Sequence, residues 1–201
     1  MKNVIFDFGG VLLDIDQSLT RKAFESLGVK NFDGLSLQLV SENFFTRFEK
    51  GQMGEKEFYT RIRNISGLAL SDLDIERAWN ATLIGLPRSS TNLLERLKRT
   101  SRIFMLSNTN CIHEKGFSLL IEKSYGLEKF RNLFERIYFS HHLGMRKPEI
   151  EIFRKVIDDN DLNPSETLFL DDSPEHVEGA RKAGLNAVYL EKGKKAEEYF
   201  T

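Results

Sequence analysis

An acidic side chain stands where the first short apolar run of the sequence ends. Asp7 follows the run that begins at Asn3, and Phe8, Gly9 and Gly10 come next. Because glycine has no Cβ, backbone N–H groups can approach an anion closely at such a turn. A carboxylate beside an anion site can attack phosphorus as a nucleophile when a metal ion screens its charge. An acid in a tight turn after a strand is the other interpretation of the same residues.

Two adjacent acids, Asp171 and Asp172, end a second apolar run that begins at Thr167. Two neighbouring carboxylates at the end of a buried strand cost free energy unless a cation compensates them. Mg²⁺ suits such a site, since it binds a few carboxylates together with phosphate and water. Capping of the helix expected at Pro174 explains one of these acids, but not both.

Polar residues that suit a phosphate lie at two further points. Ser107 and Asn108 follow a third apolar run and offer a hydroxyl and an amide to phosphate oxygens, although the same pair is common in turns. Lys147 precedes Pro148 and an expected helix, where its ammonium group can serve as a fixed positive charge for phosphate. A solvated lysine is the alternative.

The elements that must position these residues are short apolar runs separated by helical patterns. The runs lack clean alternation, which is typical of strands buried on both faces. Strands that alternate with helices predict an α/β fold with a doubly wound, Rossmann-like parallel sheet, in which ligands bind at the carboxyl ends of the strands. The expected strands are Asn3–Asp7, Arg102–Ser107, Ile137–Ser140, Thr167–Asp171 and Ala187–Leu190.

One stretch interrupts this alternation. From about Asp16 to Gly85 the pattern is helical, with apolar stripes such as Phe44, Phe45 and Phe48 and no convincing strand. We therefore expect a core domain of residues 1–15 and 86–201 and a small all-helical cap of residues 16–85, inserted after the first strand. Its aromatic residues would form its own core, with one or two facing a ligand.

Composition excludes several classes of protein. The chain has 201 residues, of which 40% are hydrophobic, so it can offset the entropy of ordering and is not disordered. Its 29 basic and 30 acidic residues give a net charge of −1, so neither nucleic acid nor an anionic membrane is an expected partner. The single cysteine, Cys111, cannot form an internal disulfide. We expect a cytoplasmic protein that is a monomer or a weak homo-oligomer.

The four motifs that contain Asp7, Ser107, Lys147 and Asp171, taken in their order along the chain, resemble those of the haloacid dehalogenase-like (HAD) hydrolase superfamily. The resemblance covers nearly the whole chain. The helical insertion is similar to the small cap of that superfamily. Three further stretches resemble the branch of sugar-phosphate phosphatases that includes glucose-1-phosphate phosphatases, namely Leu106–Asn110, Leu143–Glu149 and Asp171–Ala180. The four motifs are Asp7-Phe-Gly-Gly-Val, Leu106-Ser-Asn, Lys147-Pro148 and Leu170-Asp-Asp-Ser.

The resemblance implies roles for these residues. Asp7 would be the nucleophile that forms an aspartyl-phosphate, and Lys147 would be the second catalytic residue. Mg²⁺ would be held by Asp7, the Gly9 carbonyl and Asp172, with direct or water-mediated support from Asp171. The phosphate-binding residues implied are Phe8, Gly9, Ser107, Asn108 and Lys147.

The sequence departs from the family pattern at Gly9. Most phosphatases of the superfamily carry there a second Asp, which serves as a general acid and base. Such help is worth roughly 10²–10⁴-fold in rate. The proton would then come from water, from the substrate, or from one of the residues near the motifs, for which Asp14, Asp16 and His113 are candidates.

The predicted function is therefore Mg²⁺-dependent hydrolysis of a small phosphorylated metabolite, with a sugar phosphate as the expected class. Dehalogenation of a small haloacid is one alternative, because a halide leaves without a proton and Gly9 would be harmless. A non-catalytic protein that binds a phosphorylated metabolite is another. The paired acids Asp171 and Asp172 favour a metal-dependent reaction, and the retained Asp7 and Lys147 favour an enzyme.

Overall fold

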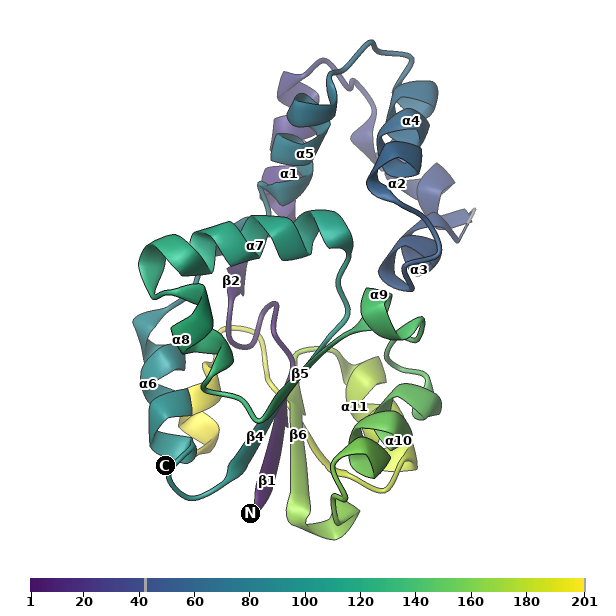
Figure 1. Cartoon of the computed structure of the whole chain (residues 1–201). Coiled ribbons are helices and arrows are strands. Elements are labelled where there is room, and N and C mark those ends of the chain that lie inside the picture. The colour runs from purple at the N-terminus through teal and green to yellow at the C-terminus, as the bar shows by residue number, and fades with distance from the viewer. Residues whose placement is uncertain (42, 201) are drawn as a thin grey trace.

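The centre of the protein is a parallel β-sheet with the strand order β5-β4-β1-β6-β7, seen in a computed structural model that describes residues 1–41 and 43–200 (Figure 1). Because β1 lies between β4 and β6, the residues that end these three strands are neighbours at one edge of the sheet. Each expected strand is present to within one residue at either end. The strands are β1 (Asn3–Phe6), β4 (Arg102–Ser107), β5 (Arg136–Phe139), β6 (Thr167–Asp171) and β7 (Asn186–Tyr189).

Helices cover both faces of this sheet, as a doubly wound fold requires. The strand β1 alternates between two cores, with Val4 and Phe6 packed toward α6, α7 and α8 and Ile5 packed toward α10 and α11. None of the described helices is long and apolar enough to cross a membrane. The bounds are α6 (Arg88–Leu97), α7 (Cys111–Ser124), α8 (Leu127–Arg131), α9 (Ser140–Leu143), α10 (Ile150–Asp159), η1 (Pro164–Glu166), α11 (Pro174–Lys182) and η2 (Ala196–Tyr199).

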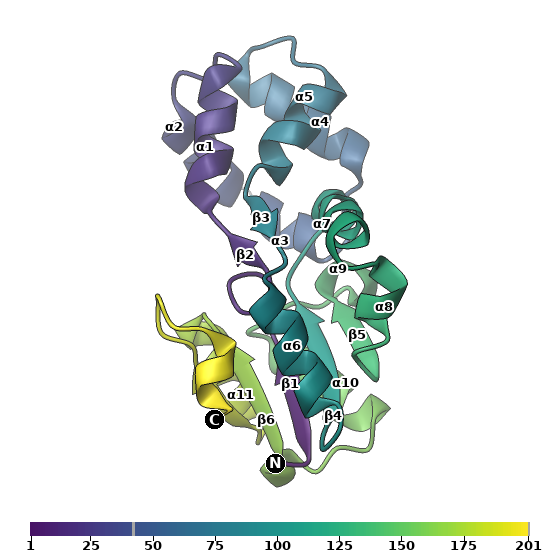
Figure 2. The ribbon, with the colours of Figure 1, turned by 90° about the vertical axis from the view of Figure 1, so that its left-hand side faces the viewer.

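The helices between β2 (Asp14–Ile15) and β3 (Leu83–Gly85) form a separate layer beyond the carboxyl edge of the sheet (Figure 2). Their aromatic residues, among them Phe24, Phe44, Phe48 and Phe58, are buried in a core of their own. We call this segment the helical insertion. The expected fold class, a doubly wound parallel sheet with helices inserted after the first strand, is confirmed. The helices of the insertion are α1 (Gln17–Ser26), α2 (Phe32–Ser41), α3 (Phe44–Glu49), α4 (Glu55–Ser66) and α5 (Asp72–Asn80).

The expectation that no strand occurs between Asp16 and Gly85 is wrong at the end of that stretch. Strand β3 (Leu83–Gly85) pairs in antiparallel fashion with β2 (Asp14–Ile15), and the Asp16 N–H donates to the Thr82 carbonyl at 2.9 Å. A strand this short has no periodicity that could be recognised. Its partner lies far away in the sequence, so the pairing joins the two chain segments that enter and leave the helical insertion.

Candidate active site

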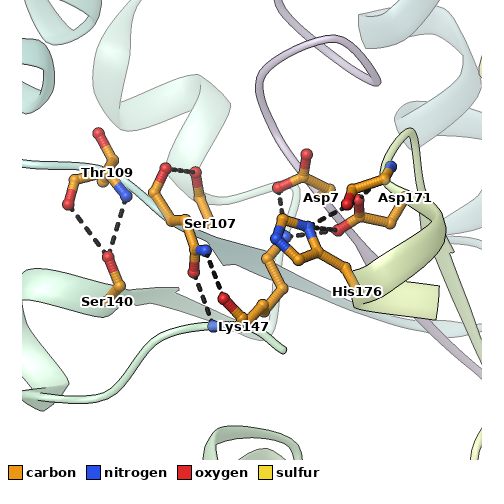
Figure 3. Close-up of polar contacts among 9 residues, drawn as sticks. Asp7, Ser107, Thr109, Ser140, Lys147, Asp171 and His176 are labelled. Atoms are coloured by element: carbon orange, nitrogen blue, oxygen red, sulfur yellow. Dashed lines mark hydrogen bonds and ion pairs between the residues drawn. The ribbon is translucent and has the colours of Figure 1, made fainter. Parts of the chain in front are cut away.

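The candidate site lies at the carboxyl ends of β1, β4 and β6, as expected for a parallel sheet. Asp7 directly follows β1, Ser107 ends β4 and Asp171 ends β6. The Asp7 N–H donates to the Leu170 carbonyl at 2.9 Å, which continues the pairing of the strands up to the site. Figure 3 shows Asp7 and Asp171 side by side, with Lys147 reaching both from below.

Lys147 is the central group of the site. Its Nζ lies 2.6 Å from Asp7 Oδ1 and 2.6 Å from Asp171 Oδ2, and its side chain is 0% exposed. The backbone of Lys147 is held by the amide of Asn108, which donates to the Lys147 carbonyl at 2.9 Å and accepts from the Lys147 N–H at 2.9 Å. The ammonium therefore has a fixed position between two carboxylates.

Burial and neighbouring charges set the protonation of Asp7 and Asp171 in opposite directions. It raises the pKa of Asp7 to about 7, with Asp171 adding to the rise and Lys147 opposing it. Burial alone would also raise the pKa of Asp171, but the Lys147 ammonium and the His176 hydrogen bond lower it to about 2. When both acids are ionised, the site holds more negative than positive charge, which a cation would compensate.

The two adjacent acids have different environments. Asp171 is 0% exposed, and its Oδ1 accepts from the Ser173 N–H at 2.8 Å and lies 2.9 Å from His176 Nδ1. Asp172 is exposed and lies against Gly10, where an added Cβ would be 2.1 Å from Asp172 Oδ2. The carboxylate oxygens of Asp171 are thus already bonded to groups of the protein, whereas the carboxylate of Asp172 lies next to the Gly10 backbone.

The acidic oxygens are arranged so that they could share one metal ion. Asp7, Asp171 and Asp172 can each offer an oxygen, and these atoms lie within 4.8 Å of one another. A set of hard oxygen donors of this kind suits Mg²⁺. The close approach of Asp172 to Gly10, which a Cβ would prevent, gives a structural reason for the second glycine of the motif.

The predicted phosphate-binding residues lie along the same edge. Ser107 is buried and lines a cavity together with Phe8, Gly9 and Asn108. The side-chain amide of Asn108 faces the backbone of Lys147, so the residue also positions the lysine.

Sequence reasoning did not identify two residues that support this edge. Ser140 Oγ accepts from the Thr109 N–H at 2.9 Å and donates to the Thr109 carbonyl at 3.0 Å, which joins the ends of β4 and β5. Glu49, in the helical insertion, accepts from Arg146 Nε at 2.7 Å. Ser140 directly follows a strand and could have been found by that position, whereas Glu49 carries no local signal.

The three candidates for the missing acid and base lie in different places. Asp14 is exposed in β2, and Asp16 caps α1 by accepting from the Ser18 N–H at 2.8 Å. Neither residue lines the cavity, whereas His113 does. Burial lowers the pKa of His113 to about 4, so its imidazole is neutral at neutral pH and cannot act as an acid there.

The cavity has a volume of about 460 Å³ and is lined at the sheet edge by Phe8, Gly9, Ser107 and Asn108, which are neighbours in sequence of Asp7 or of the end of β4. Its wall comes from both parts of the chain, because residues of α1, α2, α3 and α5 face residues of the sheet edge and α7. The lining residues include Phe8, Gly9, Ile15, Thr20, Phe32, Phe45, Phe48, Glu49, Trp79, Thr82, Ser107, Asn108, His113 and Phe117.

Comparison with known proteins places the chain in a family. The model of the haloacid dehalogenase-like hydrolases matches residues 1–184, so the chain belongs to this family. The chain is 28% identical over 193 residues to a D-ribitol-5-phosphate phosphatase of Bacteroides thetaiotaomicron, covering 96% of this chain and 93% of that protein. It is 27% identical over 191 residues to a sesquiterpene phosphatase of Aspergillus oryzae, covering 94% and 89%.

Solved structures agree with this assignment. A HAD family enzyme of Bacteroides thetaiotaomicron, crystallised in complex with magnesium and inorganic phosphate, superposes with a TM-score of 0.89. The two sequences are 33% identical, and the match covers 100% of each chain. The similarity therefore includes the helical insertion as well as the sheet.

Proposed function

We propose that this protein hydrolyses phosphate monoesters of a small metabolite through an aspartyl-phosphate on Asp7. The observation that carries the proposal is the position of Lys147 Nζ, 2.6 Å from both Asp7 and Asp171 in a buried site. A buried ammonium held at this edge can bind phosphate oxygens and keep Asp7 ionised for attack. The family membership and the similarity to two phosphatases support the same reaction.

The proposed reaction has two steps. In the first step an Asp7 carboxylate oxygen attacks phosphorus, and the bond from phosphorus to the oxygen of the alcohol breaks. The leaving alkoxide takes a proton from water, because the candidate acids either lie away from the cavity or, as with His113, are unprotonated at neutral pH. In the second step water attacks the phosphorus of the aspartyl-phosphate, which releases inorganic phosphate and restores Asp7.

The residues of the site fit a Mg²⁺ ion as the cofactor. Asp7, Asp172 and the Gly9 carbonyl would hold the ion, and Asp171, engaged by Lys147 and His176, would support it. Bound Mg²⁺ would neutralise charge that develops on the transferred phosphoryl group. The magnesium and phosphate complex of the related HAD family enzyme supports this assignment.

We further propose that residues 16–85 act as a cap on a core of residues 1–15 and 86–201. The cavity lies between the two parts, so movement of the cap would control entry and exclude bulk water during the reaction. The β2–β3 pair, through which the chain enters and leaves the cap, is the natural hinge.

The class of alcohol is the finer question. The sequence predicts a sugar phosphate, and the similarity to a ribitol phosphate phosphatase supports that class. A sesquiterpene phosphatase is a relative of nearly equal identity, so the comparisons support a phosphate monoester without deciding its alcohol.

The first test is an assay of the purified protein on p-nitrophenyl phosphate with Mg²⁺ and with EDTA, using Asp7→Asn as the control. Turnover that requires both Mg²⁺ and Asp7 supports the proposed phosphatase. Metal-independent release of halide from a small haloacid would instead favour the dehalogenase. Tight binding of phosphate without turnover on any ester would favour the non-catalytic binding protein.

A further inference from the structure

The cavity beyond the phosphate site has an ordered aromatic wall. The rings of Phe45 and Trp79 lie 5.7 Å apart with an interplanar angle of 5°, and those of Trp79 and His113 lie 5.0 Å apart at the same angle. The three residues come from α3, α5 and α7, so the stack joins the helical insertion to the core. All three line the cavity, and this wall therefore presents ring surface to whatever is attached to the phosphate.

The cavity offers no free charge to a second ionic group. Among its described lining residues there is no lysine or arginine, and Glu49 is paired with Arg146 at 2.7 Å. A substrate with a carboxylate or a second phosphate on its alcohol would place that charge in the cavity without a partner, which is unfavourable. The alcohol that fits is uncharged.

Several polar groups of the wall are already engaged within the protein, whereas Trp79 Nε1 and Thr82 Oγ1 are buried without a hydrogen-bond partner among the residues that the structure describes. Thr20 Oγ1 donates to the Trp79 carbonyl at 3.2 Å, Asn110 Oδ1 accepts from the His113 N–H, and the Asn108 amide is bound to the backbone of Lys147. A sugar needs a partner for each hydroxyl that it buries, because an unpaired hydroxyl loses its hydrogen bonds to water. An alcohol with many hydroxyls would find few partners on this wall, so the wall favours an alcohol that is mainly hydrocarbon.

We propose that the substrate is the phosphate monoester of an uncharged, mainly apolar alcohol, whose hydrocarbon body lies against the stack of Phe45, Trp79 and His113. This inference rests on the proposed function for the phosphate end of the substrate. The sequence-based expectation of a sugar phosphate is the class that it competes with. Phe45 and Trp79 are then the residues that determine specificity.

A homologous series of ligands tests the proposal without relying on turnover. Methyl-, butyl-, hexyl- and octylphosphonate, which cannot be hydrolysed, are titrated into the Mg²⁺-loaded protein by isothermal calorimetry. We expect Kd to fall by roughly three- to fourfold per methylene until the cavity is filled, as for burial of hydrocarbon. A pentitol phosphate, measured in the Asp7→Asn protein beside methylphosphonate, is expected to bind no more tightly than methylphosphonate does.

Two variants locate the effect. Phe45→Ala should reduce the gain in affinity per methylene, since it removes one ring of the stack. Leu37→Ala, at a residue of the same insertion that is 70% exposed, should leave the gain unchanged. Unchanged affinity along the wild-type series, or a preference for the pentitol phosphate, would overturn the proposal.

Turnover separates this inference from the proposed function. If the protein hydrolyses p-nitrophenyl phosphate but the Kd values do not change along the series, the proposed phosphatase activity is supported and the proposed apolar substrate is rejected. If Kd falls steeply along the series but the protein hydrolyses no ester, the proposed phosphatase activity is rejected. The cavity is then an apolar site that binds a phosphorylated ligand.

Discussion

Arg146 Nε donates a hydrogen bond to Glu49 Oε2 at 2.7 Å, so the residue before Lys147 is tied to helix α3 of the helical insertion. A second ion pair, between Lys50 and Glu149 at 2.6 Å, lies nearby. Both pairs cross from the insertion to the loop that carries Lys147. The position of the insertion is therefore linked to the backbone that presents the site ammonium.

Removing the ion pair between Arg146 and Glu49 should affect substrate binding more than the chemical step. We expect Arg146→Gln and Glu49→Gln each to raise KM about three- to tenfold, with a coupling energy of about 1 kcal/mol in a double-mutant cycle on stability. The matched control is Arg47→Gln with Glu57→Gln, an ion pair within the insertion whose side chains are 46% and 52% exposed. Equal changes in KM and equal coupling energies for the two pairs would show that the pair between Arg146 and Glu49 has no special role.

The buried charge of Asp7 should make the metal-free protein less stable as pH rises. The pKa of Asp7 is raised to about 7 in the folded state, so between about pH 4 and pH 7 the folded protein holds a proton that the unfolded chain releases. The unfolding free energy should then fall over this range, and Asp7→Asn should remove the fall. Asp171 acts in the opposite direction, because its pKa of about 2 stabilises the fold above pH 4 and loses that effect only in acid.

Urea unfolding in EDTA at pH 5 and pH 8 measures this dependence. We expect Asp7→Asn to be more stable than wild type by about 1–3 kcal/mol at pH 8, and by less at pH 5. Asp158→Asn, at an exposed position of α10, is the control. A difference between Asp7→Asn and wild type that is independent of pH would contradict the assignment.

Gly10→Ala should damage the metal site selectively. Gly10 has φ of +83°, and an added Cβ would lie 2.1 Å from Asp172 Oδ2 and displace that carboxylate. We expect Mg²⁺ affinity to fall about tenfold or more, in line with the effect of disturbing groups that orient a metal ligand. Gly193→Ala is a matched control, because Gly193 has φ of +89° but open space around the Cβ position. Similar Mg²⁺ affinities for the two variants would argue against Asp172 as a ligand.

His113 should contribute to substrate fit and not to proton transfer. Since burial lowers its pKa to about 4, the imidazole is already neutral well below physiological pH. His113→Asn should therefore leave the shape of the pH profile of kcat/KM unchanged between about pH 5.5 and 8, whereas loss of a general acid would cost roughly 10²-fold or more and change that shape. Rate measurements on an alkyl phosphate, whose leaving group is poor, give the clearest answer.

The central sheet could be predicted from the sequence because each of its strands is a short apolar run that can be recognised locally. Runs such as Arg102–Ser107 and Thr167–Asp171 are apolar on both faces, and the helices between them have clear apolar sides. Strand β3 could not be found, since its pairing with β2 is set by tertiary contact and not by pattern. Trp79 packs against the core of the insertion and also lines the cavity, a double role that no local pattern reveals.

The candidate site could be predicted as a set of residues but not as a geometry. The order of the motifs brings Asp7, Ser107 and Asp171 to one edge once the sheet is parallel. The sequence does not reveal that Lys147 lies between two carboxylates, that Asn108 holds its backbone, or that Arg146 faces Glu49. These contacts depend on loops, whose conformations follow from the whole fold.

The paired hydrogen bonds between the Asn108 amide and the Lys147 backbone have a consequence for how such a protein can diverge. Because Asn108 directly follows strand β4, the backbone of the lysine is held by the sheet as well as by the contact of Arg146 with the helical insertion. Substitutions of residues of the helical insertion that line the cavity, such as Phe45, then leave this anchor of Lys147 to the sheet intact. The lining of the cavity can therefore change during divergence while the arrangement of Asp7, Lys147 and Asp171 is kept.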